Sequence, residues 1–432
     1  VKVLHKHQSV QFVVSDAIGY YPYLPSLLID RDLDFSNQFT DQFAWNRTDL
    51  EKSLGNLPRR AQLQQPIGTA LTLAPVFLVA HGLSLVLFAL TGSAWFTPTG
   101  YTIVYQVLCS AAPMAIGLFG MFLVDDLITR RFRVPGVCTA LGVVTYWIGS
   151  NYSYYYFREP LMAHTISAFW VIATVWCSDR VLRGVRTAEL LPWNCGMLAL
   201  AVSFALVCRY TNVFLAPVLV YVAWQVVRGV GMRRIALAMP AVAVGITPLI
   251  VQLAIWRSLT GKAMHLTAQG AGYGTNERFT FWADPALWQT LFSGRHGLFF
   301  WSPVLLLAAW GLIWKMRRAE TRRDPLLITL LISAAILWYL NSAWYGWWFG
   351  WAFGARAFLE LAALFMIGMS FGFEWMSGIG RGARGVVAIL LAVAIAYNYS
   401  LMALFIAWRI PRGDYPWKPS DRLSQTMRQA QP

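Results

Sequence analysis

The feature that most constrains this chain is a run of 64 residues, 61–124, that contains no Asp, Glu, Lys or Arg. An acidic and aromatic segment precedes this run: seven of the 20 acidic residues lie between Asp16 and Glu51, beside the sequence SDAIGYYPYL. An apolar stretch of about 20 residues is enough to span a bilayer. The boundary between a water-facing acidic segment and a membrane-embedded body is therefore where we look for chemistry at a lipid interface.

The composition describes that body. The chain is 57% hydrophobic and 13% charged, against about 25% charged residues in soluble domains. Its 21 Trp and 18 Tyr suit membrane interfaces. The apolar runs are 17 to 24 residues long, whereas the strands of an outer-membrane barrel need alternating segments of about ten residues. We therefore predict an all-α fold, a polytopic transmembrane helical bundle of about 10 to 11 spans.

Ten apolar segments are the candidate spans. They are 101–124, 135–152, 160–178, 190–207, 211–227, 235–256, 297–314, 325–342, 357–375 and 385–407. The loops between them alternate in charge, since one set holds 16 Lys or Arg in 47 residues and the other set holds 7 in 64. The positive-inside rule makes the first set cytoplasmic and places the acidic segment on the extracytoplasmic side.

We expect three parts along the chain. Residues 1–65 form an outer acidic and aromatic loop, residues 66–408 form the transmembrane domain with an outer loop at 257–296, and residues 409–432 form a basic polar tail. An outer loop this early in the chain needs an upstream crossing, so we also expect a first helix before residue 1.

The apolar stretch 66–92 is the ambiguous part of the transmembrane domain. Gly68, Pro75, His81 and Gly82 interrupt its helical pattern. We interpret it as a juxtamembrane helix that lies in the outer interface or dips in and out. The alternative is a full crossing, which would place the acidic segment on the cytoplasmic side.

Charge and cysteine content exclude two other kinds of function. The net charge of +15 comes mostly from the cytoplasmic loops, so it indicates topology and anionic lipid rather than nucleic acid. The cysteines show no CxxC spacing and are expected to be small core residues without metal or disulfide roles. They are Cys109, Cys138, Cys177, Cys195 and Cys208.

Six motifs, in this order along the chain, resemble segments of one protein family. They are SDAIGYYPYLPSLLIDRDLDF, QPIGTALTLAPVFLVAH, YYYFREPLMAH, CRYTNVFLAPVL, SGRHGLFFWSPVLLL and WYGWWFGWAFGARAF. Together they resemble the C-type (GT-C) membrane glycosyltransferases that use polyprenyl-phosphate sugars, the superfamily of protein O-mannosyltransferases and lipid A aminoarabinose transferases. The resemblance covers nearly the whole chain, from about residue 15 to residue 408.

The resemblance implies a catalytic carboxylate soon after the first helix, which is Asp16 here. It also implies a K-P-P juxtamembrane helix and an acidic-Pro motif, the latter matched by Glu159 and Pro160. Two positions depart from the family pattern: Ala17 stands where many members carry Glu, and Gln65 stands where many carry Lys. These are the positions of a second carboxylate and of a phosphate contact.

The chemistry itself needs few groups. A sugar on polyprenyl phosphate already has a stabilised leaving group, so one carboxylate base and cations that hold the phosphate suffice. Asp16 is the predicted base of an inverting displacement, and an ordinary solvated or capping Asp is the alternative. Glu159 is the second predicted catalytic residue, which orients substrate or joins Asp16 on a divalent ion, and helix capping is its alternative. No cofactor or metal ligand is assigned, and a divalent cation stays open.

Substrate binding is assigned to cations and aromatic rings. Arg209 lies in a turn of about three residues between apolar helices, where a lipid phosphate is its natural partner and a salt bridge with Glu159 is the alternative. The other predicted substrate-binding residues are Tyr20, Tyr21, Arg158, His164, Arg295, His296, Tyr345 and Arg356. Membrane-interface anchoring is the alternative for the arginines and for the Trp-rich segment around Tyr345.

The sequence thus predicts a membrane glycosyltransferase in a bacterial-type inner or plasma membrane, with its active site on the extracytoplasmic side. Its expected partners are a polyprenyl-phosphate sugar donor, a lipid, glycan or protein acceptor, and membrane lipid. A secondary transporter and a lipid-binding scaffold without catalysis are the alternatives.

Overall fold

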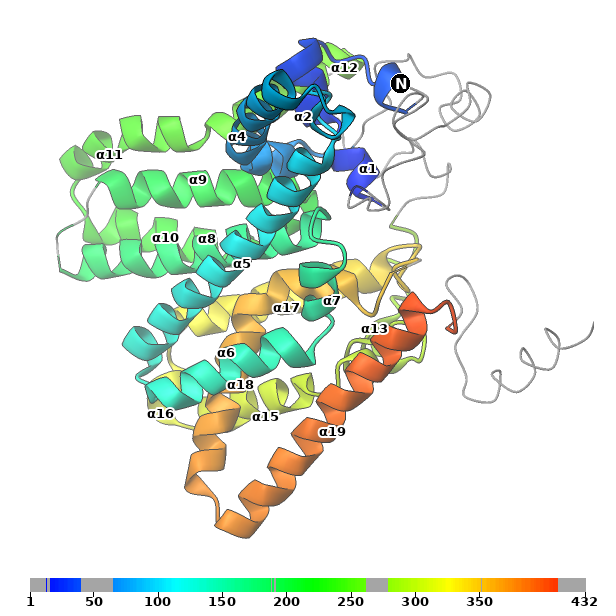
Figure 1. Ribbon diagram of the computed structural model, residues 1–432. Coiled ribbons are helices and arrows are strands. Elements are labelled where there is room, and N and C mark those ends of the chain that lie inside the picture. The colour runs from blue at the N-terminus through cyan, green and yellow to red at the C-terminus, as the bar shows by residue number, and fades with distance from the viewer. Residues whose placement is uncertain are drawn as a thin grey trace, which may run out of the picture. The chain divides into compact units, whose positions relative to one another are not determined.

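A computed structural model describes residues 13, 16–39, 65–187, 189, 192–261, 279–350 and 352–410 (Figure 1). Within these residues the predicted all-α fold is confirmed, because the chain is 79% helical and forms no strand. Six helices are long and apolar enough to cross a bilayer, or seven if one bent pair counts as a span. The chain is therefore an integral membrane protein. Most of the predicted outer loop 1–65 and almost all of the tail 409–432 lie outside the described residues, as do residues 262–278.

Contacts divide the chain into two compact units. Unit 1 contains Val1–Leu123 and Tyr155–Arg278, and unit 2 contains Val124–Tyr154 and Phe279–Pro432. Each unit is thus built from two separate stretches of sequence.

Unit 1 is a group of helices around α9. The helices and turns are α1 (Ala17–Tyr20), α2 (Tyr23–Pro25), the π-turn η2 (Ser26–Asp30), α4 (Gly68–Thr91), η5 (Ala94–Phe96), most of α5 (Ile103–Phe132), α8 (Ala163–Arg186), α9 (Pro192–Cys208), η6 (Tyr210–Leu215), α10 (Ala216–Gly229), α11 (Met232–Gly245) and α12 (Thr247–Thr260). Helix α9 packs against α8 and α11 along its length and also contacts α4 and α12 (Figure 1). The central helix therefore links the first apolar helix of the chain to the later ones.

Unit 2 is organised around α18. Its elements are α6 (Gly136–Gly149), the start of α7 (Tyr152–Phe157), α13 (Leu287–Phe292), α14 (Leu298–Trp301), α15 (Leu305–Met316), α16 (Ala319–Arg322), α17 (Pro325–Ala343), η8 (Arg356–Leu361), α18 (Ala362–Gly378) and α19 (Arg381–Ile406). Helix α18 packs against both α15 and α6. A side chain at Gly311 of α15 would collide with the backbone of Gly368 and Gly372 of α18. Glycine at these positions therefore allows the two helices to touch backbone to backbone, a common way of packing helices in membranes.

Each of the ten predicted spans contains a helix. Five of them correspond to long apolar helices, namely α5, η6 with α10, α17, η8 with α18, and α19, and the segment 235–256 is the pair α11 and α12, which are bent by 44°. The helices α6, α9 and α15 are apolar but shorter, with 10 to 17 residues. Helix α8 is long enough at 24 residues, but its second half carries Asp179 and three arginines.

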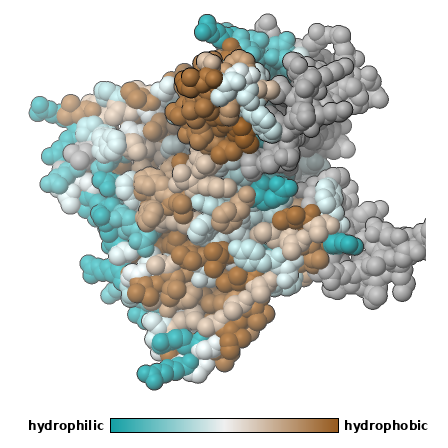
Figure 2. Space-filling model, viewed as in Figure 1, coloured by the Kyte–Doolittle hydropathy of each residue, from teal (hydrophilic) through white to brown (hydrophobic). Residues whose placement is uncertain are grey.

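The stretch 66–92 differs from its prediction in one respect. It forms a single helix, α4, of 24 residues that continues through Pro75, His81 and Gly82. In an apolar environment a helix is favoured because it satisfies the hydrogen bonds of its own backbone. Neighbouring groups can bond the carbonyl that is left free because proline has no N–H. Helix α4 has the length and composition of a membrane-crossing helix, and Figure 2 shows a hydrophobic surface over it. Its predicted position in the outer interface stays a prediction.

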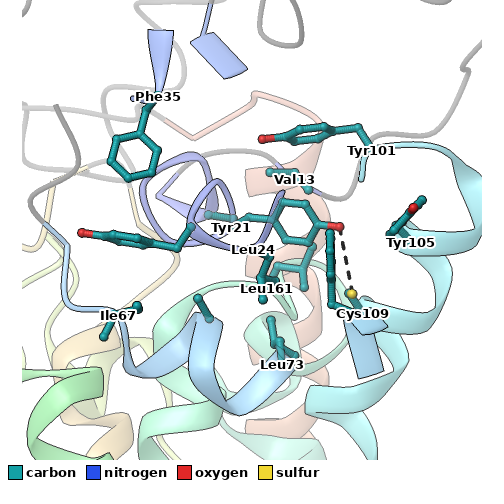
Figure 3. Close-up of a cluster of buried hydrophobic side chains, with 14 of the residues drawn as sticks. Val13, Tyr21, Leu24, Phe35, Ile67, Leu73, Tyr101, Tyr105, Cys109 and Leu161 are labelled. Atoms are coloured by element: carbon teal, nitrogen blue, oxygen red, sulfur yellow. Dashed lines mark hydrogen bonds between the residues drawn. The ribbon is translucent and has the colours of Figure 1, made fainter. Parts of the chain in front are cut away.

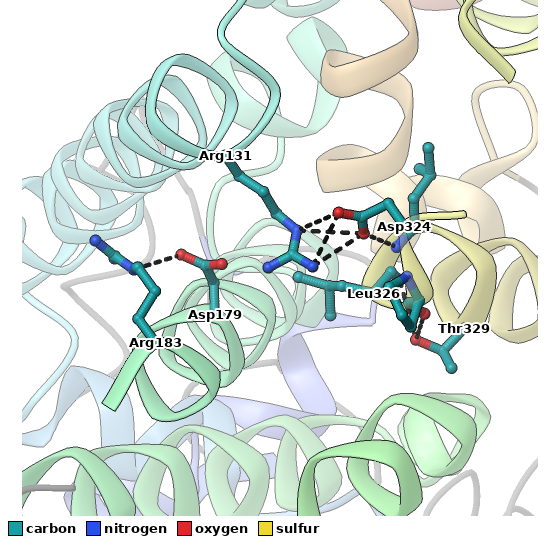
Figure 4. Close-up of polar contacts among 8 residues, drawn as sticks. Arg131, Asp179, Arg183, Asp324, Leu326 and Thr329 are labelled. Carbon is teal, nitrogen blue, oxygen red and sulfur yellow. Dashed lines mark hydrogen bonds and ion pairs between the residues drawn. The ribbon is translucent and has the colours of Figure 1, made fainter. Parts of the chain in front are cut away.

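Two pairs of oppositely charged side chains inside unit 2, Arg131 with Asp324 (Figure 4) and Lys315 with Glu374, form what we call the paired-charge region. The Arg131 guanidinium, 6% exposed, donates to both carboxylate oxygens of Asp324, with Nε to Oδ2 at 2.9 Å and Nη2 to Oδ1 at 3.0 Å. The Asp324 carboxylate also accepts from the backbone N–H of Leu327 and so caps α17. Lys315 Nζ lies 2.7 and 2.6 Å from the two carboxylate oxygens of Glu374. Each of these buried or half-buried charges therefore meets one of opposite sign.

Candidate functional site

A buried aromatic cluster in unit 1, here called the Tyr21 core, underlies the site (Figure 3). Tyr21 is 1% exposed, its hydroxyl donates to the carbonyl of Gly100 at 2.8 Å, and its ring packs against Phe77 and Tyr101. Burial raises the pKa of the Tyr21 phenol well above its ordinary value, so this tyrosine stays neutral. Ala17, Ile67, Leu161 and Cys208 belong to the same core. Segments far apart in sequence therefore meet here.

Asp16 lies at the edge of this core. It is the N-cap residue of α1, and its carbonyl accepts from the N–H of Gly19 at 2.9 Å. The side chain is half-buried and forms no capping hydrogen bond, which removes the capping alternative. Asp16, Gly19 and Tyr20 share one face of the turn because they are three and four residues apart. A Cβ at Gly19 would collide with the Gln65 side chain, so this face is turned toward Gln65.

The predicted substrate-binding tyrosines differ in environment. Tyr20 and Tyr21 are both buried, at 7% and 1% exposure, and the hydroxyl of Tyr21 is used by Gly100. Tyr23, which is 1% exposed, donates to the carbonyl of Gln65 at 3.1 Å. These contacts make Tyr21 and Tyr23 supports of the α1–α2 segment rather than exposed ligand contacts.

Glu159 precedes α8 by more than was expected. The helix begins at Ala163 with Met162 as its N-cap, and its first turn contains no acidic residue. The predicted start at Pro160 is therefore three residues too early, and capping is not the role of Glu159. The Glu159 side chain is half-buried, and the neighbouring Arg158 is exposed.

The side chains of Arg209 and His164 are in contact, which the sequence analysis did not predict. Arg209 is the N-cap of η6, with extended backbone, and follows the last residue of α9. One of its guanidinium nitrogens, Nη1, lies 3.4 Å from Nε2 of His164, which is 2% exposed and packs against Tyr155 at a ring separation of 5.5 Å. His164 therefore positions the Arg209 guanidinium at the start of α8.

The start of α4 packs against the end of α9, the residues that precede Arg209 in the chain. A Cβ at Gly68 would sit within 2.5 Å of the Cys208 nitrogen and would also collide with the backbone of Val207. Glycine therefore allows the first turn of α4 to contact the end of α9. The first N–H groups of any helix have no intrahelical acceptor and carry its positive dipole end. The first turn of α4 contains no acidic side chain to compensate it.

Two residues that the sequence analysis missed complete this region. Gln252 of α12 is fully buried, and its Oε1 accepts from the backbone N–H of Ile67 at 2.8 Å. Its Nε2 has no hydrogen-bond partner among the described residues. The hydroxyl of Tyr210 is buried and also lacks a partner of good geometry there. In the sequence, the only signals for these two residues were an amide side chain inside the apolar segment 235–256 and a tyrosine next to Arg209. We call Gln65, His164, Arg209, Tyr210 and Gln252 the Arg209 cluster.

The remaining predicted residues belong to unit 2 and are Arg295, His296, Tyr345 and Arg356. Together with Trp348 we call them the Arg295 cluster. The Arg295 guanidinium lies 4.2 Å from the ring centre of Trp348, a cation–π contact. Tyr345 packs edge-on against Trp348 at 6.3 Å. Arg356 begins η8 and is half-buried.

His296 is the centre of this second cluster. It is 3% exposed, adopts a left-handed backbone with φ of 62°, and its Nδ1 lies 2.5 Å from the carbonyl of Trp348. Burial, followed by the neighbouring charges of Arg356 and Arg295, lowers the pKa of His296 from 6.5 to about 4. The imidazole is therefore neutral at pH 7 with its proton on Nδ1, and Nε2 carries a lone pair.

No group of three His, Cys, Asp or Glu side chains among the described residues is arranged to hold a metal ion.

Comparison of the chain with family models, with curated proteins and with solved structures finds no match. The function therefore has to be argued from the two clusters and the sequence.

Proposed function

We propose that this protein is a membrane glycosyltransferase that transfers a sugar from a polyprenyl-phosphate donor to an acceptor hydroxyl on the extracytoplasmic side. One observation carries the proposal. The segments that hold Asp16, the start of α4, the Glu159–Leu161 turn and Arg209 meet around the Tyr21 core, although they are far apart in sequence. A carboxylate and a guanidinium near the start of one apolar helix are the groups that this reaction needs.

The step balances as a single displacement. The Asp16 carboxylate takes the proton of the acceptor hydroxyl, and the acceptor oxygen forms a bond to C1 of the sugar. The bond between C1 and the phosphate oxygen breaks, and its electron pair leaves on polyprenyl phosphate. Arg209 offers a planar fork of donors to the phosphate as its charge grows. Attack opposite the leaving phosphate inverts the configuration at C1.

Reconstituted protein tests the reaction. The purified chain in lipid vesicles would be given polyprenyl-phosphate donors with different sugars and a mixture of lipid, glycan and peptide acceptors. We expect release of polyprenyl phosphate to depend on an acceptor, and the product to have the opposite anomeric configuration, read by NMR. Retained configuration, or no turnover with any donor, would contradict the proposal.

The side of the membrane is tested separately. Ala283 lies in the loop expected outside and Ala319 in a basic loop expected inside, and both are exposed. A cysteine at Ala283 should react with a membrane-impermeant thiol reagent in intact cells, whereas one at Ala319 should react only after permeabilisation. The reverse pattern would move the proposed site to the cytoplasmic side.

A transporter is the second candidate, because Glu360 of η8 is 1% exposed and lies in a helix long enough to cross the membrane. Acidic groups at such positions often mark ion pathways, and the bent pair α11–α12 has the broken form seen in transporters. Proton-coupled uptake of sugar into vesicles that disappears in Glu360→Gln, without any transfer activity, would favour this function.

A further inference from the structure

The Gln252 side chain occupies a position that its structural role does not fully explain. Its Oε1 accepts the N–H of Ile67, immediately before α4. A backbone N–H can only donate, so this contact fixes which end of the amide is the oxygen. Nε2 therefore carries two hydrogens, and no acceptor for them exists among the described residues. Leaving a buried donor unpaired costs about 1 to 3 kcal/mol.

Tyr210 presents a second donor of the same kind. Its ring packs against Trp256, at a ring separation of 5.1 Å, one helical turn beyond Gln252 on α12. The indole N–H of Trp256 lies near the Tyr210 oxygen and can donate to it. An indole has no acceptor, so it cannot take the hydroxyl proton of Tyr210. The hydroxyl proton of Tyr210 therefore still lacks an acceptor within the described part of the chain.

The surroundings of both donors favour negative charge. Arg209 directly precedes Tyr210 in the chain. Gln252 accepts the N–H of Ile67, and directly after Ile67 comes the first turn of α4, whose positive dipole end has no acidic side chain in that turn. A guanidinium, a helix N-terminus and two unused donors attract an anion with several acceptor oxygens. Phosphate has that form, and water is the other molecule that could satisfy buried donors.

We propose that Tyr210 and Gln252 donate hydrogen bonds to the phosphate oxygens of the polyprenyl-phosphate donor, beside Arg209. This inference rests on the proposed function and names further binding residues for it. Since Gln252 is fully buried, the phosphate reaches it only after a local rearrangement. The adjacent Gln65 carbonyl is held by the hydroxyl of Tyr23, a contact that such a rearrangement can break.

Two substitutions separate binding from folding. Tyr210→Phe removes only the unused hydroxyl, so thermal stability should stay the same or rise, while affinity for polyprenyl phosphate should fall about 10- to 100-fold. Gln252→Glu keeps the acceptor for Ile67 but replaces the donor by a second acceptor. Its affinity should fall by a similar factor, and further as the pH is raised and the new carboxylate ionises.

Tyr156→Phe is the matched control. The Tyr156 hydroxyl donates to the Met114 carbonyl at 2.5 Å, so its loss should lower stability and leave affinity unchanged. Binding would be measured in detergent by intrinsic tryptophan fluorescence with three probes: polyprenyl phosphate, polyprenol without phosphate, and inorganic phosphate. We expect tight binding of the first, weak binding of the second, and competition by the third only at high concentration.

The outcomes are distinct. Unchanged affinity in both Tyr210→Phe and Gln252→Glu would overturn the inference, with buried water as the occupant, even if the wild-type protein transfers sugar. Binding of inorganic phosphate that gains nothing from the polyprenyl chain would overturn the lipid assignment. Wild-type binding that depends on both residues, without transfer of any sugar, would support this inference and contradict the proposed function.

Discussion

The paired-charge region of unit 2 and the Arg209 cluster of unit 1 use similar residues in different ways. Arg131 donates to both oxygens of Asp324, and Lys315 lies against both oxygens of Glu374. In the Arg209 cluster the guanidinium contacts a histidine ring, and the donors of Tyr210 and Gln252 are unused within the described residues. The closed pairs join helices, whereas the buried donors that have no acceptor among the described residues are the ones for which we propose a ligand.

The largest stability effect should come from opening a closed pair. Arg131→Met leaves the Asp324 carboxylate without its guanidinium in a site where the two side chains are 6% and 18% exposed. We expect a loss of about 3 to 5 kcal/mol, read from denaturation in detergent. Adding Asp324→Asn should recover much of the loss, since asparagine can still cap α17. Equal stability of Arg131→Met and wild type would show that the pair does not hold the helices together.

His296 gives a pH test of the second cluster. The pKa of the folded state is about 4, below the ordinary 6.5, so the unfolded chain takes up the proton first as the pH falls. The contribution of His296 to the free energy of unfolding should be fully present above about pH 6.5. It should fall by up to about 3 kcal/mol as the pH approaches 4. His296→Asn, which tolerates the left-handed backbone, should remove this component. The same pH slope in wild type and variant would assign it to other groups.

The substitution Arg209→Lys tests whether the Arg209 cluster binds a ligand. The substitution keeps the charge but removes the bidentate fork. We expect transfer activity to fall about 10- to 100-fold, in line with the loss of one charged hydrogen bond, with little change in thermal stability. Normal activity together with reduced stability would place Arg209 with the closed pairs.

Two glycines of α4 provide the smallest and best matched comparison. Gly68→Ala collides with the backbone at Val207 and Cys208, so the start of α4 must move, at a cost of about 1 to 3 kcal/mol. Gly82 has nothing within 4 Å of an added Cβ, and Gly82→Ala should raise helix stability by about 0.5 to 1 kcal/mol. Thermal unfolding of the two variants compares them directly, and equal shifts would argue against the close contact between α4 and α9.

The sequence predicted the helices better than the contacts between them. Apolar runs and alternating charged loops are local signals, and each of the ten expected spans contains a helix. The stretch 66–92 was interpreted as a juxtamembrane helix, and α4 continues through Pro75 and Gly82 because these residues disfavour helix less in an apolar environment than in water. The start of α8 was placed three residues early because Pro160 is a common first helical residue, but here the helix begins at Ala163.

The residues of the site were harder to predict for a physical reason. The Tyr21 hydroxyl is used by a carbonyl 79 residues away, and Gln252 reaches a backbone N–H 185 residues away. Unused donors become visible only after such long-range contacts are known. Arg209 was predicted because a charge between two apolar helices is costly wherever it packs.

The central claim is that Asp16 is the base of a sugar transfer, and its most direct test is the turnover of Asp16→Asn in vesicles. Asparagine keeps the shape of the half-buried side chain but cannot accept the proton, so transfer should fall by roughly 10² to 10⁴ with unchanged insertion and stability. Asp284→Asn, at an exposed carboxylate of unit 2, should have no effect. Full transferase activity in Asp16→Asn would contradict the account.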